Sequence, residues 1–384
     1  MKEFQFRSPG NIICRDGSSG NPESFKALSL HGPALLVTDP TLVKLEIAGK
    51  VMEALELAGI DVILFAEVEP EPKAETVRKL VGITEQKHIG TVIGLGGGSP
   101  MDVAKIAALL LSHPQPIKSM YGVGMAIGDR LPLILIPTTA GTGSEGTPVA
   151  VVTGDNGEKS PIVGPQFICD HVILDAELTL GLPKKVTAAT GIDAMVHAIE
   201  AYTSSVRKNP VSDQLSIQAL KLLYNNIRTV IDQGHNLEAR RDMLLGSMMA
   251  GLAFANSTVG AVHALAYPLG TQFHLSHGES NAVVLAPVMK YNFDKASKLY
   301  AELWKSISKR PYSVTDDEAA SQFIREIEIL IPEIGLKDRL TLYGIKETNL
   351  NNITRGALKQ ERLLSYNISK MDEEDIYKVY KLVL

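Results

Sequence analysis

The stretch TVIGLGGGSPMD, Thr91 to Asp102, combines a short apolar run with a cluster of glycines and leads into the helical segment Met101 to Leu111. The apolar run has the length of a buried strand. Glycines after such a strand let backbone N–H groups approach a phosphate, and Ser99 and the start of the helix offer further donors. The pattern departs from GxGxxG because Ser99 occupies the place of the last glycine. A tight structural turn is therefore the alternative interpretation.

Strands alternate with helices on both sides of this stretch, over roughly the first 180 residues. Such alternation predicts a parallel sheet that is covered by helices on both faces. The expected strands are Pro33–Asp39, Asp61–Val68, Thr91–Gly98, Leu131–Thr139, Thr147–Thr153 and His171–Leu178, with a hairpin or edge strand over Phe4–Cys14. The expected helices between them are Thr41–Ala58, Lys73–Lys87 and Met101–Leu111.

The pattern changes near Gly181–Pro183, beyond which apolar residues recur only at helical spacing. We expect two domains, an α/β domain over residues 1–181 and an all-helical domain over residues 182–384. Helices are predicted over Lys185–Ser205, Val211–Asp232, Leu237–Ala255, Glu279–Tyr291, Asp317–Leu330 and Glu373–Leu384, with a shorter one around His263 that Pro268 and Gly270 interrupt.

The composition indicates an ordinary globular protein of 384 residues, with 45% hydrophobic and 21% charged residues. A net charge of -5 argues against a nucleic-acid partner or an anionic membrane surface, because there is no basic excess to neutralise phosphates. No run of eighteen apolar residues and no N-terminal signal pattern is present, so we expect no membrane insertion. The two cysteines, Cys14 and Cys169, form no disulfide framework, which favours a cytoplasmic location.

Two further features support nucleotide binding. A second polar loop, PTTAGTGSEGT at Pro137–Thr147, also follows a predicted strand, and two such loops would frame the crevice where open α/β sheets bind nucleotides. Asp39 ends the first buried strand, where a carboxylate accepts hydrogen bonds from ribose hydroxyls and repels a 2′-phosphate. Asp39 therefore favours NAD over NADP. Its alternative role, as the N-cap of the next helix, is compatible with the first.

The stretch GIDAMVHAIEAY, Gly191–Tyr202, places Asp193 and His197 one turn apart on the same helix face. Apolar or small residues surround them in nearly every direction, so the helix is expected to be buried. A buried carboxylate is unfavourable unless a positive partner meets it, and a divalent metal is the simplest such partner. A carboxylate near a helix start with a separate core histidine is the alternative interpretation.

A second histidine cluster lies in Gly260–Asn281 and contributes His263, His274 and His277. One carboxylate oxygen and three imidazole nitrogens, with room for water, suit iron or zinc better than calcium or magnesium. The expected ligands are Asp193, His197, His263 and His277. His274 is the spare histidine, at the surface or lining a pocket.

Four motifs occur together and in a fixed order: GGGSPMD at Gly96–Asp102, PTTAGTGSE at Pro137–Glu145, AATGIDAMVHAIEAY at Ala188–Tyr202 and HALAYPLG…HGxxNA at His263–Ala282. Through these motifs, which span most of the chain, the sequence resembles the iron-containing (group III) alcohol dehydrogenase family. The resemblance implies a Rossmann-like nucleotide-binding domain, an all-α metal-binding domain and a site in the cleft between them. This is the dehydroquinate synthase-like/iron alcohol dehydrogenase fold.

The resemblance also assigns roles to individual residues. It implies Fe²⁺, with Zn²⁺ as the alternative, on the same four ligands, and NAD(H) as the second cofactor. Its expected cofactor contacts, completed by Asp39 and Asp102, are Gly97, Gly98, Ser99, Thr138, Thr139, Thr147 and Lys159, the last near the nicotinamide ribose. It further implies a homodimer or a higher homo-oligomer, for which the segment Phe4–Arg7 is a candidate pairing edge.

Two departures from the family pattern concern the substrate side of the site. Many members carry a histidine four residues after the third ligand, where this chain has Tyr267, a phenol with a reference pKa of about 10. Tyr267 and His274 are the candidate proton relays, with a water chain through the cofactor ribose as the alternative. The C-terminal region also lacks the Asn-Pro-Arg that is common near the family's end.

The candidates for an apolar pocket wall, for which core packing is the alternative, are Val149, Leu252, Phe254 and Val259.

The function expected from these features is hydride transfer between nicotinamide and a small primary alcohol or aldehyde whose oxygen meets the metal. One alternative is an NAD-using lyase or cyclase of the dehydroquinate synthase type. Such an enzyme would be expected to carry several basic residues for a substrate phosphate, which are not found around His263–Asn281. The other alternative is a non-catalytic relative. The sequence leaves open the particular alcohol, the physiological direction and the choice of metal.

Overall fold

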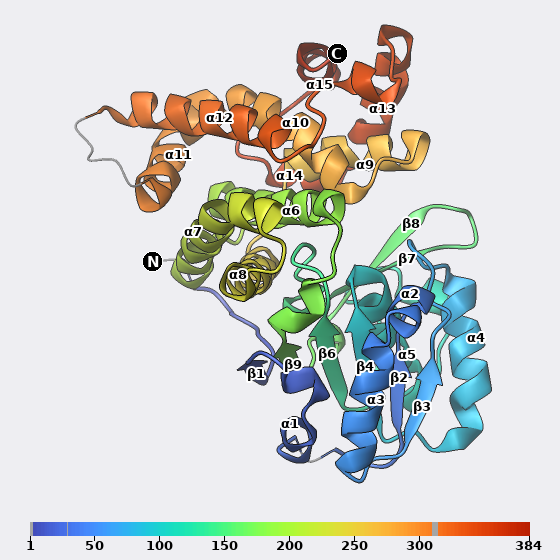
Figure 1. The fold of residues 1–384 in the computed structure, drawn as a ribbon. Coiled ribbons are helices and arrows are strands. Elements are labelled where there is room, and N and C mark those ends of the chain that lie inside the picture. The colour runs from blue at the N-terminus through green and yellow to red at the C-terminus, as the bar shows by residue number, and fades with distance from the viewer. Residues whose placement is uncertain (1–2, 29, 309–313) are drawn as a thin grey trace. The chain divides into compact units, whose positions relative to one another are not determined.

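A computed structural model describes residues 3–28, 30–308 and 314–384 (Figure 1). Its internal contacts divide the chain into two compact units. One unit is the α/β region Arg7–Gly181, and the other contains Leu182–Leu384 together with the N-terminal segment up to Phe6. The division after Gly181 coincides with the change of hydrophobic pattern in the sequence.

The α/β unit contains a six-stranded sheet in the order β1-β9-β6-β4-β2-β3, and all of its pairings are parallel. This confirms the predicted parallel sheet. Its strands are β1 (Asn11–Cys14), β2 (Ala34–Val37), β3 (Val62–Phe65), β4 (Thr91–Gly96), β6 (Leu133–Pro137) and β9 (His171–Leu174). The helices of this unit are α1 (Pro22–Lys26), α2 (Pro40–Lys44), α3 (Ile47–Leu57), α4 (Ala74–Thr84) and α5 (Gly98–Ser112).

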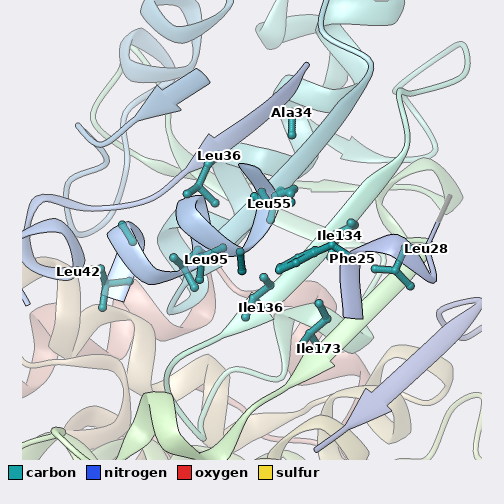
Figure 2. Packing of buried hydrophobic residues seen from close by; sticks show 14 residues of the cluster. Phe25, Leu28, Ala34, Leu36, Leu42, Leu55, Leu95, Ile134, Ile136 and Ile173 are labelled. Carbon is teal, nitrogen blue, oxygen red and sulfur yellow. The ribbon is translucent and has the colours of Figure 1, made fainter. Parts of the chain in front are cut away.

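Both faces of the sheet are covered, as the alternation of side chains along its strands shows. Leu36, Leu95 and Ile134 point to the face that packs against α1, α2 and α3, in a cluster that includes Phe25 (Figure 2). Gly94 points to the opposite face, where a Cβ atom on it would lie 2.8 Å from the Cβ of Ala104 in α5. The glycine therefore allows α5 to approach β4 closely.

Three sequence predictions for this unit are wrong in detail. The segment Thr147–Thr153 does contain a strand, β7 (Val149–Thr153), but β7 belongs to a separate sheet of order β5-β8-β7, whose β5 is Gly122–Val123. There it pairs antiparallel with β8 (Lys159–Val163), a strand that was not predicted from the sequence. The hairpin turn between them contains Asn156-Gly157, with Gly157 at φ 78°, and this dipeptide is a strong hairpin signal.

The expected helix Thr41–Ala58 is interrupted, because Glu46 adopts a left-handed conformation with φ 61° between α2 and α3. Likewise, the expected hairpin or strand over Phe4–Cys14 is reduced to β1, which starts at Asn11 and forms the sheet edge beside β9. The segment Phe4–Arg7 is not a strand.

A buried lysine ties α5 to the second polar loop. Lys105 is fully buried, and its Nζ donates to the backbone carbonyls of Ser144 at 2.6 Å, Thr147 at 3.1 Å and Val149 at 2.7 Å. Asp102 Oδ1 lies 4.0 Å from the same nitrogen. Burial lowers the pKa of Lys105 and raises the pKa of Asp102, because both charges lose contact with water.

We expect Lys105→Met to destabilise the protein by on the order of 3 kcal/mol, because three carbonyl groups and the Asp102 carboxylate would lose their cation. Urea unfolding measures the change. Lys79→Met is the matched control, since Lys79 is half exposed in an ion pair with Glu67, and its loss is expected to cost less than about 1 kcal/mol. Equal effects of the two substitutions would contradict the role given to Lys105.

The second unit is helical, and among its described residues no strand is assigned. Its helices are α6 (Lys184–Thr203), α7 (Pro210–Asp232), α8 (Leu237–Asn256), α9 (Ala261–Phe273), α10 (His277–Tyr291), α11 (Phe293–Ile307), α12 (Asp316–Glu333), α13 (Leu350–Leu358), α14 (Glu361–Tyr366) and α15 (Glu373–Leu382). Helices α11, α13 and α14 were not predicted from the sequence. The predicted interruption of α9 at Pro268 and Gly270 is wrong, since the helix continues to Phe273.

Helix α9 continues through a proline. Pro268 has no N–H to donate to the preceding turn, so the Ala264 carbonyl lacks its usual helical partner. The hydroxyl of the buried Tyr380 donates to the next carbonyl, that of Leu265, at 2.6 Å and ties α9 to α15.

No single helix in the described ranges has the length and apolar content that a membrane crossing requires, and the one pair that passes together, α8 and α9, is bent by 109°.

Candidate metal centre and nucleotide-binding loops

Helix α6 carries two of the four predicted metal ligands in a buried environment. Every residue from Gly191 to Thr203 is buried, because α6 packs against α7, α8 and α10. The side chains of Asp193 and His197 are 4% and 6% exposed. Nearly complete burial explains why polar residues in this helix require partners within the protein.

Helices α9 and α10 bring the other two predicted ligands to the same point. One ligand atom from each of Asp193, His197, His263 and His277 lies within 4.8 Å of the others. The Nε2 atoms of His197 and His263 are each 4.0 Å from Asp193 Oδ1, and that of His277 is 3.5 Å away. The His277 side chain is 38% exposed, so the cluster is accessible from one side.

The donor set fits a divalent metal. The Nε2 atom of His263 is buried and has no hydrogen-bond partner among the described residues, although an imidazole nitrogen in that position ordinarily requires one. Burial raises the pKa of Asp193, but the three neighbouring imidazoles and a hydrogen bond from Asn281 outweigh it, and the pKa is lowered overall. An ionised oxygen donor with three nitrogen donors suits iron or zinc.

Two polar residues beside the cluster were not identified as functional from the sequence. Asn281 donates from Nδ2 to Asp193 Oδ1 at 2.7 Å, and Glu200 Oε2 lies 2.6 Å from His263 Nδ1. A signal for Glu200 was present, because Asp193, His197 and Glu200 are spaced i, i+4, i+7 on one helix face. Asn281 lies in the HGxxNA motif, but only its helix register with His277 reveals its target.

The start of α10 is held in place by two local features. Ser276 and Glu279 form a capping box, in which each side chain meets the backbone N–H of the other. Gly278 packs so tightly against α6 that a Cβ atom on it would lie 2.0 Å from the Ala189 carbonyl oxygen. These features fix His277, the first residue of α10, with respect to Asp193.

The candidate relay residues lie at different places. The Tyr267 ring is 6.1 Å from the His277 ring in an edge-on arrangement. His274 is exposed, adopts a left-handed conformation with φ 57° after α9, and is not part of the four-residue cluster. Of the candidate wall residues, Phe254 stacks on His197 with ring centroids 4.5 Å apart. Leu252 is buried, and the half-buried Val149 lies in the α/β unit.

In the α/β unit, the predicted nucleotide-binding residues follow adjacent strands. The chain runs from β2 to β3 towards one edge and then crosses to β4 and on to β6 and β9 towards the other, so the order reverses between β2 and β4. Asp39 follows β2, Gly97 follows β4, and Thr138 follows β6. Nucleotides bind open α/β sheets outside the carboxyl ends of the strands at such a reversal.

The glycine-rich loop leaves its backbone accessible. Helix α5 begins at Gly98 without a side-chain cap, and Gly97, Gly98 and Ser99 are half-buried. A Cβ atom on Gly97 would lie 3.4 Å from Thr139 Oγ1, and one on Gly98 would lie 3.1 Å from Thr142 Cγ2. The two polar loops are therefore adjacent, and the glycines keep the space between them free of side chains, as a bound pyrophosphate requires.

The remaining predicted cofactor residues also have partners within the protein. Asp39 caps α2 by accepting from the backbone N–H groups of Thr41 and Leu42 through Oδ1. Asp102 accepts from Ser144 Oγ at 2.7 Å and from the Val151 N–H at 2.9 Å. The hydroxyl of Thr147 faces Lys105, and Lys159 pairs with Glu71 at 2.6 Å. Their contacts with a cofactor stay predictions.

The same loop contains a buried carboxyl group, that of Glu145, which was not among the predicted functional residues. Glu145 is 1% exposed, and neither of its carboxyl oxygens has a hydrogen-bond partner among the described residues. Burial raises its pKa to about 7, despite its own backbone N–H and the charge of Lys105. Glu145 is therefore largely protonated below neutral pH.

A raised pKa in the folded state makes stability fall as pH increases, because the unfolded chain ionises Glu145 at a lower pH. At pH 5 we expect Glu145→Gln and the unmodified protein to have nearly the same free energy of unfolding. At pH 8 we expect the free energy of unfolding of Glu145→Gln to be higher by on the order of 2 kcal/mol. Urea titrations from pH 5 to 8 measure this difference. Glu158→Gln, at an exposed position, is the control for the chemical change itself. A difference between Glu145→Gln and the unmodified protein that is constant across this range would contradict the prediction.

Comparisons with known proteins place the whole chain in one group of enzymes. Residues 9–176 match the family model described as iron-containing alcohol dehydrogenase, and residues 187–384 match that of the C-terminal part of the Fe-containing alcohol dehydrogenase family. The chain is 39% identical over 350 residues to long-chain-alcohol dehydrogenase 1 of Geobacillus thermodenitrificans (strain NG80-2), covering 90% of this chain and 88% of that protein.

Solved structures give the same result. A crystal structure of 1,3-propanediol oxidoreductase superimposes with a TM-score of 0.95 and 32% identity over the full length of both chains. The structure of sulfoacetaldehyde reductase from Bifidobacterium kashiwanohense in complex with NAD⁺ superimposes with a TM-score of 0.88 and 28% identity, covering 100% of this chain and 99% of the other.

Proposed function

The chain belongs to the iron-containing alcohol dehydrogenase family, and from this membership we propose the details of its activity. It is an alcohol dehydrogenase of the NAD-dependent, metal-binding kind that interconverts an alcohol and its aldehyde. The observation that carries the proposal is the convergence of Asp193, His197, His263 and His277 within 4.8 Å. We assign these four residues as the metal ligands.

Ferrous iron is the proposed metal, and zinc is the alternative that the same ligands would accept. NAD(H) is the proposed cofactor. Its expected contacts are Asp39 at the ribose, Gly97, Gly98 and Ser99 at the pyrophosphate, Thr138, Thr139 and Thr147 in the second loop, and Asp102 and Lys159. The adjacency of the two loops at the carboxyl ends of β4 and β6 supports this assignment.

The protein's own residues prepare this chemistry. When bound, the metal supplies Lewis-acid stabilisation for the substrate oxygen, and nicotinamide gives or accepts the hydride. Asn281 holds the Asp193 carboxylate through Oδ1, and the ring of Phe254 covers one face of His197. The exposed side of His277 leaves the ligand cluster accessible to a small molecule. No side-chain nucleophile is required.

We propose a small primary alcohol or aldehyde as the substrate. The compared proteins carry the names of a long-chain-alcohol dehydrogenase, a propanediol oxidoreductase and a sulfoacetaldehyde reductase. What these names share is the alcohol or aldehyde group, whereas the rest of the substrate differs. The proposal that the substrate carries an alcohol or aldehyde group is therefore better supported than any proposal about the rest of the substrate.

Metal reconstitution tests the function. Protein is stripped with a chelator, reloaded anaerobically with Fe²⁺ or Zn²⁺, and assayed for NADH oxidation with a panel of short and long aldehydes. We expect activity to return only with metal, and the better of the two metals to identify the native one. Failure to consume NADH although NADH and metal both bind would overturn the redox function and favour a lyase or a non-catalytic relative.

Tyr267 is the proposed proton relay, because its ring lies against His277. We expect Tyr267→Phe to lower kcat about a hundredfold with metal content unchanged, since a general acid or base contributes about this much. His274→Ala is the comparison. If His274→Ala lowers kcat and Tyr267→Phe does not, His274 is the proton relay. If neither substitution lowers kcat, a water chain is favoured.

A cytoplasmic location and a homodimer stay predictions. The location rests on the two cysteines, and the dimer rests on the family. Because Phe4–Arg7 is not a strand, a dimer that pairs through it would require this segment to change conformation. Gel filtration that shows a monomer at working concentration would contradict the dimer.

A further inference from the structure

Glu200 connects the first turn of α9 to the predicted metal centre. Its side chain lies on α6 and is 6% exposed. Oε1 accepts from the Val262 N–H at 2.7 Å, and Oε2 lies 2.6 Å from His263 Nδ1. The N-cap residue of α9 is Gly260, which has no side chain, so Glu200 supplies from another helix the acceptor that a capping side chain would otherwise provide.

We propose that Glu200 is a positioning residue that fixes the tautomer of His263 and thereby prepares it to bind the metal. This inference rests on the metal-dependent function proposed above. The carboxylate oxygen Oε2 accepts a hydrogen bond at 2.6 Å, so the Nδ1–H of His263 donates to it. In a neutral imidazole the other nitrogen, Nε2, then carries the lone pair.

The position of Nε2 agrees with this assignment. It lies 4.0 Å from Asp193 Oδ1, within the group of four ligand atoms, and is buried without a hydrogen-bond partner among the described residues. A lone pair on Nε2 is available to a cation held by the four ligand atoms. A hydrogen atom on Nε2 would instead point at that cation. The bond to Glu200 thus selects the form of His263 that can act as a ligand.

An amide cannot replace this carboxylate. Glu200 offers one acceptor oxygen to each of two donors, Val262 N–H and His263 Nδ1–H. Glutamine has a single oxygen. If that oxygen stays with Val262, the NH₂ group faces Nδ1 and favours the tautomer with hydrogen on Nε2; if it turns to His263, the buried Val262 N–H loses its partner.

The test compares Glu200→Gln with Glu302→Gln in the full-length protein. Glu302 accepts a hydrogen bond from the Tyr202 hydroxyl, also on α6, so the control makes the same chemical change next to the same helix. Metal affinity is measured by competition between the apoprotein and a chromophoric chelator for Zn²⁺. We expect Glu200→Gln to weaken binding 10- to 100-fold and Glu302→Gln to leave it within about twofold.

A second measurement does not depend on the variant folding. In the unmodified apoprotein labelled with ¹⁵N-histidine, and assigned with His263→Ala, NMR reports which ring nitrogen of His263 carries the proton. We expect Nδ1 in the unmodified protein, and a shift towards Nε2 in Glu200→Gln. A proton on Nε2 in the unmodified protein, or equal metal affinities of Glu200→Gln and the unmodified protein, would overturn the inference.

These outcomes are separable from failure of the proposed function. If the unmodified protein binds no metal, the metal-dependent function fails, and the tautomer of His263 in the apoprotein still tests the role of Glu200. If the unmodified protein and Glu200→Gln bind metal tightly and equally, the metal-dependent function stands and the positioning role of Glu200 is wrong.

Discussion

Asp193→Asn is expected to abolish metal binding and to reduce kcat/KM at least about a thousandfold. The three histidine Nε2 atoms lie 3.5 to 4.0 Å from Asp193 Oδ1, and Asp193 is the one carboxylate in the cluster. An amide has neither the charge nor the basicity of a carboxylate. Lewis-acid stabilisation is worth several kcal/mol, and about 4 kcal/mol corresponds to a thousandfold in rate.

The fold is expected to survive this substitution. The carbonyl oxygen of an asparagine at position 193 can still accept from Asn281 Nδ2, and the change removes a buried charge. Metal content by elemental analysis, steady-state kinetics and thermal unfolding of the apoprotein measure the three effects. Asp242→Asn is the control, because Asp242 accepts from Asn226 elsewhere in the helical unit. Full metal content in Asp193→Asn would remove Asp193 from the ligand set.

Gly278→Ala is expected to destabilise the protein by about 3 kcal/mol or more and to weaken metal binding at the same time. A Cβ atom at this position would lie 2.0 Å from the Ala189 carbonyl oxygen and 2.5 Å from its carbonyl carbon. Both are backbone atoms, so α10 must move away from α6. His277 and Asn281 would move with α10, and both reach Asp193 on α6.

The matched control is Gly82→Ala in α4, where an added Cβ atom would meet nothing within 4 Å. Alanine is the better helix former, so this change is expected to be neutral or to stabilise by up to about 1 kcal/mol. Urea unfolding and Zn²⁺ competition are measured for both variants. The prediction is wrong if Gly278→Ala and Gly82→Ala change the free energy of unfolding equally, or if Gly278→Ala leaves the metal affinity unaltered. Either result would show that the close contact between α6 and α10 does not fix the positions of the metal ligands.

Local patterns in the sequence were sufficient for the sheet, for most of the helices and for the four residues that meet in the cluster. Buried strands and amphipathic helices each depend on a short repeat of apolar residues, and so the alternation up to Gly181 and the helical pattern after it could be read directly. The spacing of Asp193 and His197 placed them on one helix face without any knowledge of neighbouring helices.

Tertiary structure alone decided the features that depend on residues far apart in the chain. The apolar pattern of β7 resembles that of a strand in the parallel sheet, yet its hairpin with β8 places it in a second sheet. Lys105 is buried because a loop some forty residues later surrounds its ammonium group with carbonyls. Glu200 faces His263 across 63 residues of sequence, and Asn281 faces Asp193 across 88. Hydrogen bonds of this kind act over about 3 Å. Helix spacing places Glu200 on the same face as Asp193 and His197, but it does not tell which residue of another helix Glu200 meets, so only the packed helices and strands reveal these partners.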